Sequence, residues 1–446
     1  MKRIINPALY LLILLMTSFS GISQINPRFR PIPPKYNVNS PNPTYALNIK
    51  YDNIEPNKQL FHLFLPDTQG SFPLVVFIHG GGFTGGSPSV VIQDASRRAE
   101  IKYYLEQGIA YASFGYRLIA ENQADTEGVI KCLNDSKRAL QFVRYYANDL
   151  HIDPDRIVLT GGSAGAGTSL WLGTRDDMAD PSAADPVLRE STRPCAVAIR
   201  GSQATYDLYK WETQVYHNFD GQGTNYTLDS IVNLLGYQRA SNFYGGLDSI
   251  YQILYDPALI QYREDVDMLF HMSSDDPPLY FANPSQAVHP SQDLFHHSFH
   301  GREINIAAIA AGISEVKANI PALSINTTNG ETQQQFVIRH LNTCTLNGES
   351  HQTSGHIQNT TILQNTPNIT VDVFPNPARE YITINLSEEN IRDIELYSIS
   401  GQLMSKQSGE LSNTITMPTH MLAPGIYFLT VTSEQGIKLT HKVIVE

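Results

Sequence analysis

The sequence predicts an α/β domain built on a doubly wound, mostly parallel sheet, followed by a small all-β sandwich. In the first part, short apolar segments alternate with longer amphipathic ones, which is the order of strand–helix–strand units. After residue 370, apolar and polar residues alternate between turns, which favours short antiparallel strands. We therefore expect a signal peptide at 1–23, the α/β domain at 24–346, a polar linker at 347–370 and the β domain at 371–446.

The strands of the α/β domain are predicted from short apolar runs, because a parallel strand is buried on both faces. The runs that meet this description are Pro73–His79, Ile109–Tyr116, Arg156–Thr160, Ala196–Arg200 and Pro278–Asn283. Segments with helical spacing lie between or after them, at Gln93–Gln107, Val129–Asn148, Ile304–Ala311 and Gln333–Asn342. A further strand is expected at Ile320–Ile325. Right-handed crossovers would place helices on both faces of the sheet.

Composition narrows the range of functions. The 446 residues are 41% hydrophobic and 17% charged, with a formal net charge of −12. An acidic chain without a lysine and arginine cluster is not expected to bind nucleic acid, whose phosphates require a basic surface. The three cysteines, Cys132, Cys195 and Cys344, allow one disulfide bridge but form neither a disulfide framework nor a zinc motif. No cofactor and no metal ion are predicted.

The first 23 residues have the organisation of a secretory signal. Two basic residues precede an apolar run from Ala8 to Met16, and Gly21–Ser23 supplies small residues for cleavage. The run is shorter than the roughly 20 residues that span a bilayer. We expect cleavage and no transmembrane segment in the mature chain, with an uncleaved N-terminal anchor as the alternative.

The first candidate for chemistry is a serine between glycines. The segment Gly161–Gly165 has the pattern Gly-x-Ser-x-Gly, follows a predicted strand and opens a predicted helix. A sharp strand-to-helix turn needs neighbours without bulk, and it would expose the Ser163 hydroxyl near the positive end of the helix. Ser163 is therefore the predicted nucleophile. A glycine-rich helix start without chemistry is the alternative.

A second glycine-rich segment, His79–Phe83, directly follows the first buried strand. Its three glycines would let the backbone approach a substrate and present N–H groups to it. We predict that Gly81 and Gly82, together with Ala164, donate hydrogen bonds to the negative oxygen of a tetrahedral intermediate. A flexible loop without such a role is the alternative.

The two motifs in this order resemble the α/β-hydrolase superfamily, in particular the HGGG-type esterases and lipases. The resemblance covers roughly Leu60–Leu346. It implies that Ser163 is the nucleophile and that Gly81, Gly82 and Ala164 form the oxyanion hole. It also implies that an acid and then a histidine follow later in the chain.

The acid has two candidates. The family places it after the strand that we expect at Pro278–Asn283, where the first carboxylate is Asp293. Asp276 precedes this strand and would lie about 15 Å away, at the opposite edge of the sheet. If the strand were instead Met268–Ser273, Asp276 would be the natural acid. We favour Asp293.

The histidine departs from the family's order. No histidine follows directly after the strand expected at Ile320–Ile325, and His340 is expected on a helix surface. The segment Leu294–Gly301 holds three histidines in a loop on the catalytic side of the sheet, and a loop can deliver a base to a serine. We predict His297 as the general base, with His296 as the alternative. The other interpretations are that the cluster only lines the pocket or caps a helix, and that it forms a metal site, although the spacing fits no standard metal site.

Four segments of the predicted β domain carry a second resemblance. They are Phe374–Ala378, Leu396–Gly401, Leu422–Phe428 and His441–Val445. Their combination resembles the C-terminal sorting domain of type IX secretion in Bacteroidetes. The resemblance implies the secretion machinery as a partner and a secreted or cell-surface location. A carbohydrate-binding or adhesion module is the alternative.

These residues together predict a secreted serine hydrolase that cleaves carboxylic esters through an acyl-enzyme on Ser163. The acidic composition and the sorting domain favour acyl esters of polysaccharides as substrate, or else a small-molecule ester. A serine peptidase and a non-catalytic surface-binding protein on the same scaffold are the alternatives.

Overall fold

The computed structural model describes residues 25–344, except 122, 218 and 220–225, and residues 371–445, except 388–389, 399–402, 409–411, 421 and 435–437. The predicted signal peptide and the predicted linker lie outside the described residues.

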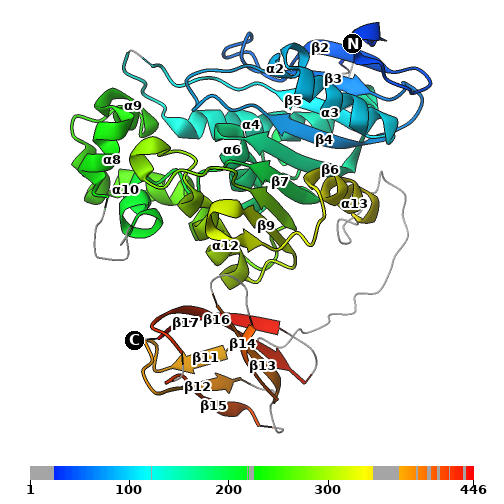
Figure 1. Cartoon of the computed structure of the whole chain (residues 1–446). Coiled ribbons are helices and arrows are strands. Elements are labelled where there is room, and N and C mark those ends of the chain that lie inside the picture. Colours follow the sequence, from blue (N-terminus) through cyan, green and yellow to red (C-terminus); the bar gives the residue numbers. More distant parts are fainter. Residues whose placement is uncertain are drawn as a thin grey trace, which may run out of the picture.

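A ten-stranded sheet forms the centre of the larger domain (Figure 1). Its strands are β1 (Arg30–Pro31), β2 (Thr44–Lys50), β3 (Leu60–Leu65), β4 (Phe72–Ile78), β5 (Ala110–Phe114), β6 (Ile152–Gly162), β7 (Ala196–Arg200), β8 (Leu279–Ala282), β9 (Val316–Ile320) and β10 (Ile325–Asn326). Their spatial order is β1-β2-β3-β5-β4-β6-β7-β8-β9-β10. The run from β5 to β9 in this order is parallel, and the remaining strands join its two edges antiparallel. The predicted α/β class is confirmed.

Helices cover both faces of this sheet. They are α2 (Val90–Gln93), α3 (Ala95–Glu106), α4 (Val129–Tyr145), α5 (Ala147–Leu150), α6 (Ala164–Thr174), α12 (Ser298–Ala311) and α13 (Gln333–Thr343). Side chains of β4 alternate between two cores. Leu74, Val76 and Ile78 pack with residues of α4, α6 and α12, whereas Val75 and Phe77 pack with residues of α3 and α13. A parallel strand buried on both faces explains why β4 has no polar residue.

A helical insertion separates β7 from β8 and lies at one side of the sheet (Figure 1). It contains α7 (Leu208–Lys210), a π-helical turn (Trp211–Val215), α8 (Leu228–Leu235), α9 (Tyr237–Phe243), α10 (Pro257–Asp265) and α11 (Met268–His271). The strand considered at Met268–Ser273 is therefore wrong. Asp267 begins α11 there, because its carboxylate accepts a hydrogen bond from the N–H of Leu269.

Two other predicted elements have different bounds. The strand expected at Ile320–Ile325 is β9, which ends at Ile320, because Pro321 begins a 3₁₀ turn that leads into β10. The helix expected from Ile304 begins at Ser298. His340, expected on a surface, is buried on α13, where its Nε2 lies 3.1 Å from Glu315.

One disulfide joins Cys195, which directly precedes β7, to Cys344, which follows α13. The Cα atoms are 5.7 Å apart, and 149 residues separate the two cysteines in the sequence. Cys132 is free and buried in α4. The bridge therefore ties the last described residue of the larger domain to its sheet.

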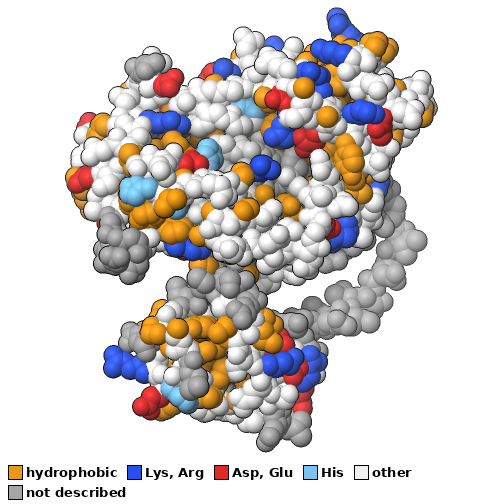
Figure 2. Space-filling model, viewed as in Figure 1, with side chains coloured by type: hydrophobic (Ala, Val, Ile, Leu, Met, Phe, Trp, Pro, Cys, Tyr) orange, Lys and Arg blue, Asp and Glu red, His pale blue; other side chains and the backbone are white. Residues whose placement is uncertain are grey.

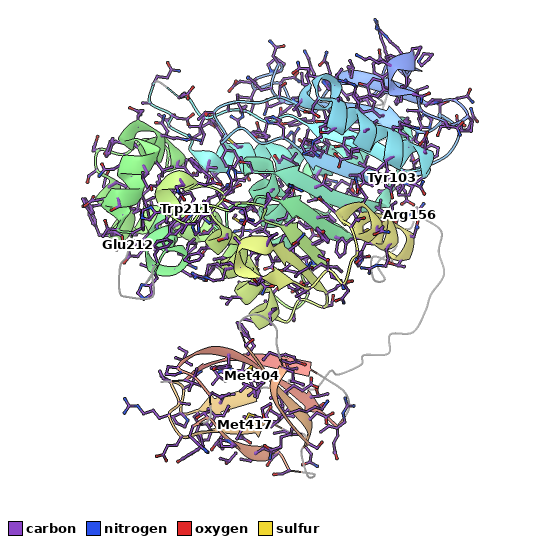
Figure 3. All side chains as sticks on the ribbon, viewed as in Figure 1. Tyr103, Arg156, Trp211, Glu212, Met404 and Met417 are labelled. Carbon is purple, nitrogen blue, oxygen red and sulfur yellow. A yellow bond between two sulfur atoms is a disulfide. The ribbon has the colours of Figure 1, made fainter. Side chains whose placement is uncertain are left out.

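The C-terminal domain is a sandwich of two antiparallel sheets. Its strands are β11 (Val371–Phe374), β12 (Tyr381–Leu386), β13 (Ile391–Ser398), β14 (Leu403–Ser408), β15 (Thr414–Pro418), β16 (Gly425–Ser433) and β17 (Lys438–Val445). One sheet has the order β11-β12-β15, and the other has the order β14-β13-β16-β17. Alternate residues such as Ile382, Ile394 and Leu429 form the shared core. Met417, which is labelled in Figure 3, belongs to the same core. The predicted small β domain is confirmed.

The surface carries interspersed charges. Figure 2 shows acidic and basic side chains distributed over the visible face of the larger domain. Within the part of the chain that the structure describes, no helix combines the length and the apolar character needed to cross a membrane.

Candidate active site

Ser163 lies in a sharp turn between β6 and α6. Its backbone has φ 55° and ψ −125°, a conformation that costs a non-glycine residue energy and that recurs at functional sites. A Cβ on Gly161 would lie 2.3 Å from the carbonyl oxygen of Gly165, and a Cβ on Gly165 would lie 2.0 Å from the carbonyl oxygen of Ile78. Both glycines are therefore required by space, as the sequence predicted from the sharpness of the turn.

The glycine loop after β4 lies directly against this turn. A Cβ on Gly80 would lie 2.6 Å from the carbonyl oxygen of Gly162 and 3.2 Å from the Cβ of Ser163. Gly81 and Gly82 have φ angles of +118° and +59°, which glycine adopts without strain. The two glycine-rich segments, about 80 residues apart in the sequence, are neighbours in the fold.

Ser163, His296 and Asp293 form one chain of contacts. The Nε2 atom of His296 lies 2.9 Å from the Oγ atom of Ser163, and its Nδ1 atom lies 3.1 Å from Oδ1 of Asp293. The same Oδ1 atom accepts a hydrogen bond from the backbone N–H of His296 at 3.1 Å. Ser285 donates its hydroxyl to Oδ2 of Asp293 at 2.8 Å. The carboxylate is held from two sides, and it orients the imidazole toward the serine.

The structure corrects the choice of histidine. His297, predicted as the base, caps α12, where its Nδ1 accepts a hydrogen bond from the N–H of Phe299 at 3.3 Å. Its ring lies among Tyr216, Phe219 and Phe299, and its Nε2 is buried without a hydrogen-bond partner among the described residues. Burial lowers the pKa of His297. The neighbouring His296 takes the position beside the serine.

The side chains of the three clustered histidines, His296, His297 and His300, lie in different surroundings. His300, the third, is fully buried in α12 and accepts a hydrogen bond from the N–H of Ala204 at 3.2 Å. Burial lowers the pKa of His300 to about 3, so this ring is neutral. No group of three metal-ligating side chains with the geometry to hold an ion occurs among the described residues.

Asp276 lies away from the serine, at the start of β8. It is buried, pairs with Arg193 at 3.3 Å and accepts a hydrogen bond from the N–H of Ser273 at 2.9 Å. Burial raises the pKa of Asp276 to about 6. It lies at the edge where β8 begins, whereas Oδ1 of Asp293 lies 3.1 Å from Nδ1 of His296.

A pocket of about 200 Å³ opens onto the serine. Five of its eleven lining residues are phenylalanine, tyrosine or tryptophan, and part of the wall comes from the insertion between β7 and β8, to which Trp211 belongs (Figure 3). The lining residues are Gly82, Phe83, Ser163, Ala164, Gln203, Tyr206, Trp211, Arg239, Phe243, Phe295 and His296. The pocket therefore brings together Ser163, His296 and two of the three predicted oxyanion donors, Gly82 and Ala164.

One signal in the sequence distinguishes His296 from His297. A carboxylate often accepts a hydrogen bond from a backbone N–H two or three residues later, and such a turn places the side chains of Asp293 and His296 together. His297 instead stands directly before a helix. No motif marked Arg239, which reaches the pocket from α9 of the insertion.

Comparisons with known proteins agree with these two domains. Residues 61–242 match the family BD-FAE, and residues 372–446 match the family described as secretion system C-terminal sorting domain. Acetylcholinesterase from Gallus gallus is 40% identical over 96 residues, which cover 21% of this chain and 12% of that protein. Para-nitrobenzyl esterase from Bacillus subtilis is 30% identical over 132 residues, which cover 28% of this chain and 27% of that protein. The chain thus spans less than a third of the length of these relatives.

Similar proteins of known structure include two bifunctional proteins. An acetyl ester-xyloside bifunctional hydrolase from Caldicellulosiruptor lactoaceticus has 19% identity and a TM-score of 0.40, covering 72% of this chain and 97% of that one. A bifunctional GH43-CE protein from Bacteroides eggerthii has 18% identity and a TM-score of 0.46, covering 67% of this chain and 38% of that one. The chain therefore combines an α/β domain, of which residues 61–242 match the BD-FAE family, with a β domain that matches the secretion system C-terminal sorting domain.

Proposed function

We propose that this protein is a serine esterase that hydrolyses carboxylic esters through an acyl-enzyme on Ser163. The observation that carries the proposal is the 2.9 Å contact between Nε2 of His296 and Oγ of Ser163 inside a pocket. A serine hydroxyl is a weak nucleophile until a base within hydrogen-bond reach removes its proton. The match to the BD-FAE family and the esterase names of the curated relatives support the same activity.

In the first half-reaction, Oγ of Ser163 attacks the ester carbonyl while its proton passes to Nε2 of His296. Asp293 orients the imidazole and stabilises the positive charge that this proton creates. The bond from the carbonyl carbon to the alcohol oxygen then breaks, and the alcohol leaves with the proton from Nε2. The acyl group stays on Ser163.

The negative charge of the tetrahedral intermediate needs donors that are already in place. We assign this role to the backbone N–H groups of Gly81, Gly82 and Ala164. Gly82 and Ala164 line the pocket beside Ser163, and Ala164 is the first residue of α6, whose positive end faces the site. In the second half-reaction, His296 deprotonates a water molecule, which attacks the acyl carbon and releases the acid.

We further propose that the substrate is an acyl ester of a polysaccharide or a small ester, and that the enzyme is exported. The sorting-domain match at residues 372–446 supports transfer to the cell surface or the medium by the type IX machinery. Two assays test these points. One measures acetate or ferulate released from acylated xylans, and the other locates the protein in host cells with and without residues 371–446. Retention inside the cell should follow the deletion.

The test of the activity is turnover of p-nitrophenyl acetate by the full chain. Ser163→Ala should reduce kcat by about 10⁴-fold or more, because removing a triad member costs this much. A fluorophosphonate should label the wild type and Ser96→Ala, an exposed serine on α3, but not Ser163→Ala. Absence of both labelling and turnover in the wild type would favour the surface-binding alternative. Cleavage of peptide anilides in preference to esters would favour the peptidase alternative.

A further inference from the structure

Arg239 places a positive charge in the wall of the serine pocket. Its side chain reaches the pocket from α9, and its Nη2 donates a hydrogen bond to the carbonyl oxygen of Gly82 at 3.2 Å. The guanidinium carbon lies 4.8 Å from the ring centroid of Phe295. Gly82 belongs to the glycine loop, and Phe295 directly precedes His296. The cation is therefore held beside the atoms that would react.

Among the described residues, this charge has no ion-pair partner. Arg263, on the next helix, pairs with Asp207 at 2.8 Å, whereas Arg239 forms no ion pair within the described residues. Its Nε atom is buried and has no hydrogen-bond partner there. Burial lowers the pKa of Arg239, and the exposed Glu121 offsets this effect in part. Arginine nevertheless stays protonated, so the pocket holds an incompletely compensated cation.

A bound anion would supply the missing partner. The planar guanidinium has five N–H donors, of which one is engaged by Gly82, and its geometry suits a carboxylate. The aromatic side chains of Phe83, Trp211 and Phe243 line the same pocket and would hold the carbon skeleton of the ligand. The positive charge and the apolar walls together favour an organic acid as the ligand.

We propose that Arg239 makes this pocket selective for esters that carry a carboxylate close to the scissile bond. The proposal rests on the esterase function and specifies its substrate class. The carboxylate belongs either to the acyl part or to the alcohol part of the ester, and two matched pairs of substrates distinguish these sources.

The first pair is 4-nitrophenyl hydrogen adipate and its methyl ester, in which the charge lies on the acyl part. The second pair is 3-acetoxybenzoate and its methyl ester, in which the charge lies on the leaving alcohol. For each pair, the ratio of kcat/KM for the anionic member to kcat/KM for the neutral member is measured with the full chain. The ratio cancels general effects of a substitution on the catalytic groups.

The wild type should prefer the anionic member of at least one pair. Arg239→Gln should lower that ratio by about 10- to 100-fold, the range expected for loss of a charge-assisted hydrogen bond. Arg239→Lys should give an intermediate ratio, because it keeps the charge without the planar fork. Arg97→Gln is the matched control. Arg97 also stacks on a ring, that of Phe77 at 4.1 Å, but outside the serine pocket, so its ratio should equal that of the wild type.

Binding provides a measurement that does not depend on turnover. Calorimetry with adipate and with 3-hydroxybenzoate, neither of which has an ester bond, should show affinity for the wild type and for Ser163→Ala, and at least a tenfold loss in Arg239→Gln. If no substrate is turned over but this pattern of binding is found, the esterase function fails and the anion site stands. Equal ratios for wild type and Arg239→Gln, or equal binding of the acids, would overturn the anion site.

Discussion

Replacing each of the two adjacent histidines in turn tests most directly the proposed roles of Ser163, His296 and Asp293. His296→Gln removes the nitrogen that lies 2.9 Å from Oγ of Ser163, and glutamine cannot accept the proton at neutral pH. By comparison with other triads, kcat should fall by about 10⁴- to 10⁶-fold, which corresponds to about 5–8 kcal/mol of transition-state stabilisation. The loss should appear in kcat, because the histidine acts on the transition state.

His297→Asn is the matched control. Asparagine is a good N-cap, so it can accept the hydrogen bond from the N–H of Phe299 that His297 accepts at 3.3 Å. Loss of the buried ring should lower the free energy of unfolding by about 1–3 kcal/mol while kcat stays within a few fold of the wild type. The substituted side chain is not in contact with Ser163, and this explains the small effect on rate.

The assay is the initial rate of p-nitrophenyl acetate hydrolysis at saturating substrate, with thermal unfolding recorded for each variant. Thermal unfolding separates a missing base from an unfolded protein. If folded His297→Asn lost turnover while His296→Gln retained it, the base would be His297. The arrangement of Ser163, His296 and Asp293 would then have no catalytic meaning.

Three further outcomes are expected. Gly80→Ala should reduce kcat by about 100-fold or more, because the new Cβ would lie 2.6 Å from a backbone oxygen of the serine turn. Gly85→Ala is the control, and it should keep kcat near that of the wild type because its Cβ would have an ordinary contact at 3.8 Å. The double substitution Cys195→Ser, Cys344→Ser should cost about 5 kcal/mol in the free energy of unfolding according to the chain-entropy model for a closed loop of 149 residues, and a drop in Tm of less than a degree would contradict this. His300, with its pKa lowered to about 3 by burial, is neutral when folded but binds a proton below about pH 6.5 when unfolded, so acid destabilises the fold. Urea unfolding between pH 6.5 and 4.5 should show about 2–3 kcal/mol less acid-induced loss in His300→Gln than in the wild type, and identical slopes would refute the assignment.

Local sequence patterns predicted most of the strands and helices. Apolar runs bounded by glycine and turn residues predicted β4, β6, β7 and β8, because a strand buried on both faces needs no distant information to be recognised. The glycines around Ser163 follow from the turn itself, in which a Cβ would collide with the backbone. The alternation after residue 370 predicted the β sandwich for the same reason, since side chains of a strand point to opposite faces.

The remaining features of the site depend on how segments that are distant in the sequence come together in the fold. Adjacent residues of a loop point in different directions, so the sequence singled out the histidine pair but chose His297 where the turn at Asp293 directs His296 to the serine. The disulfide depends on α13 returning to β7, and Arg239 depends on an inserted helix reaching the glycine loop. The sequence by itself determined the secondary-structure elements and the glycine-bounded turn at Ser163, because these are set by local sterics and burial. Only the tertiary structure decided which histidine lies beside Ser163, which cysteines form the disulfide and which charge lies in the pocket, because these are contacts between residues that no local pattern brings together.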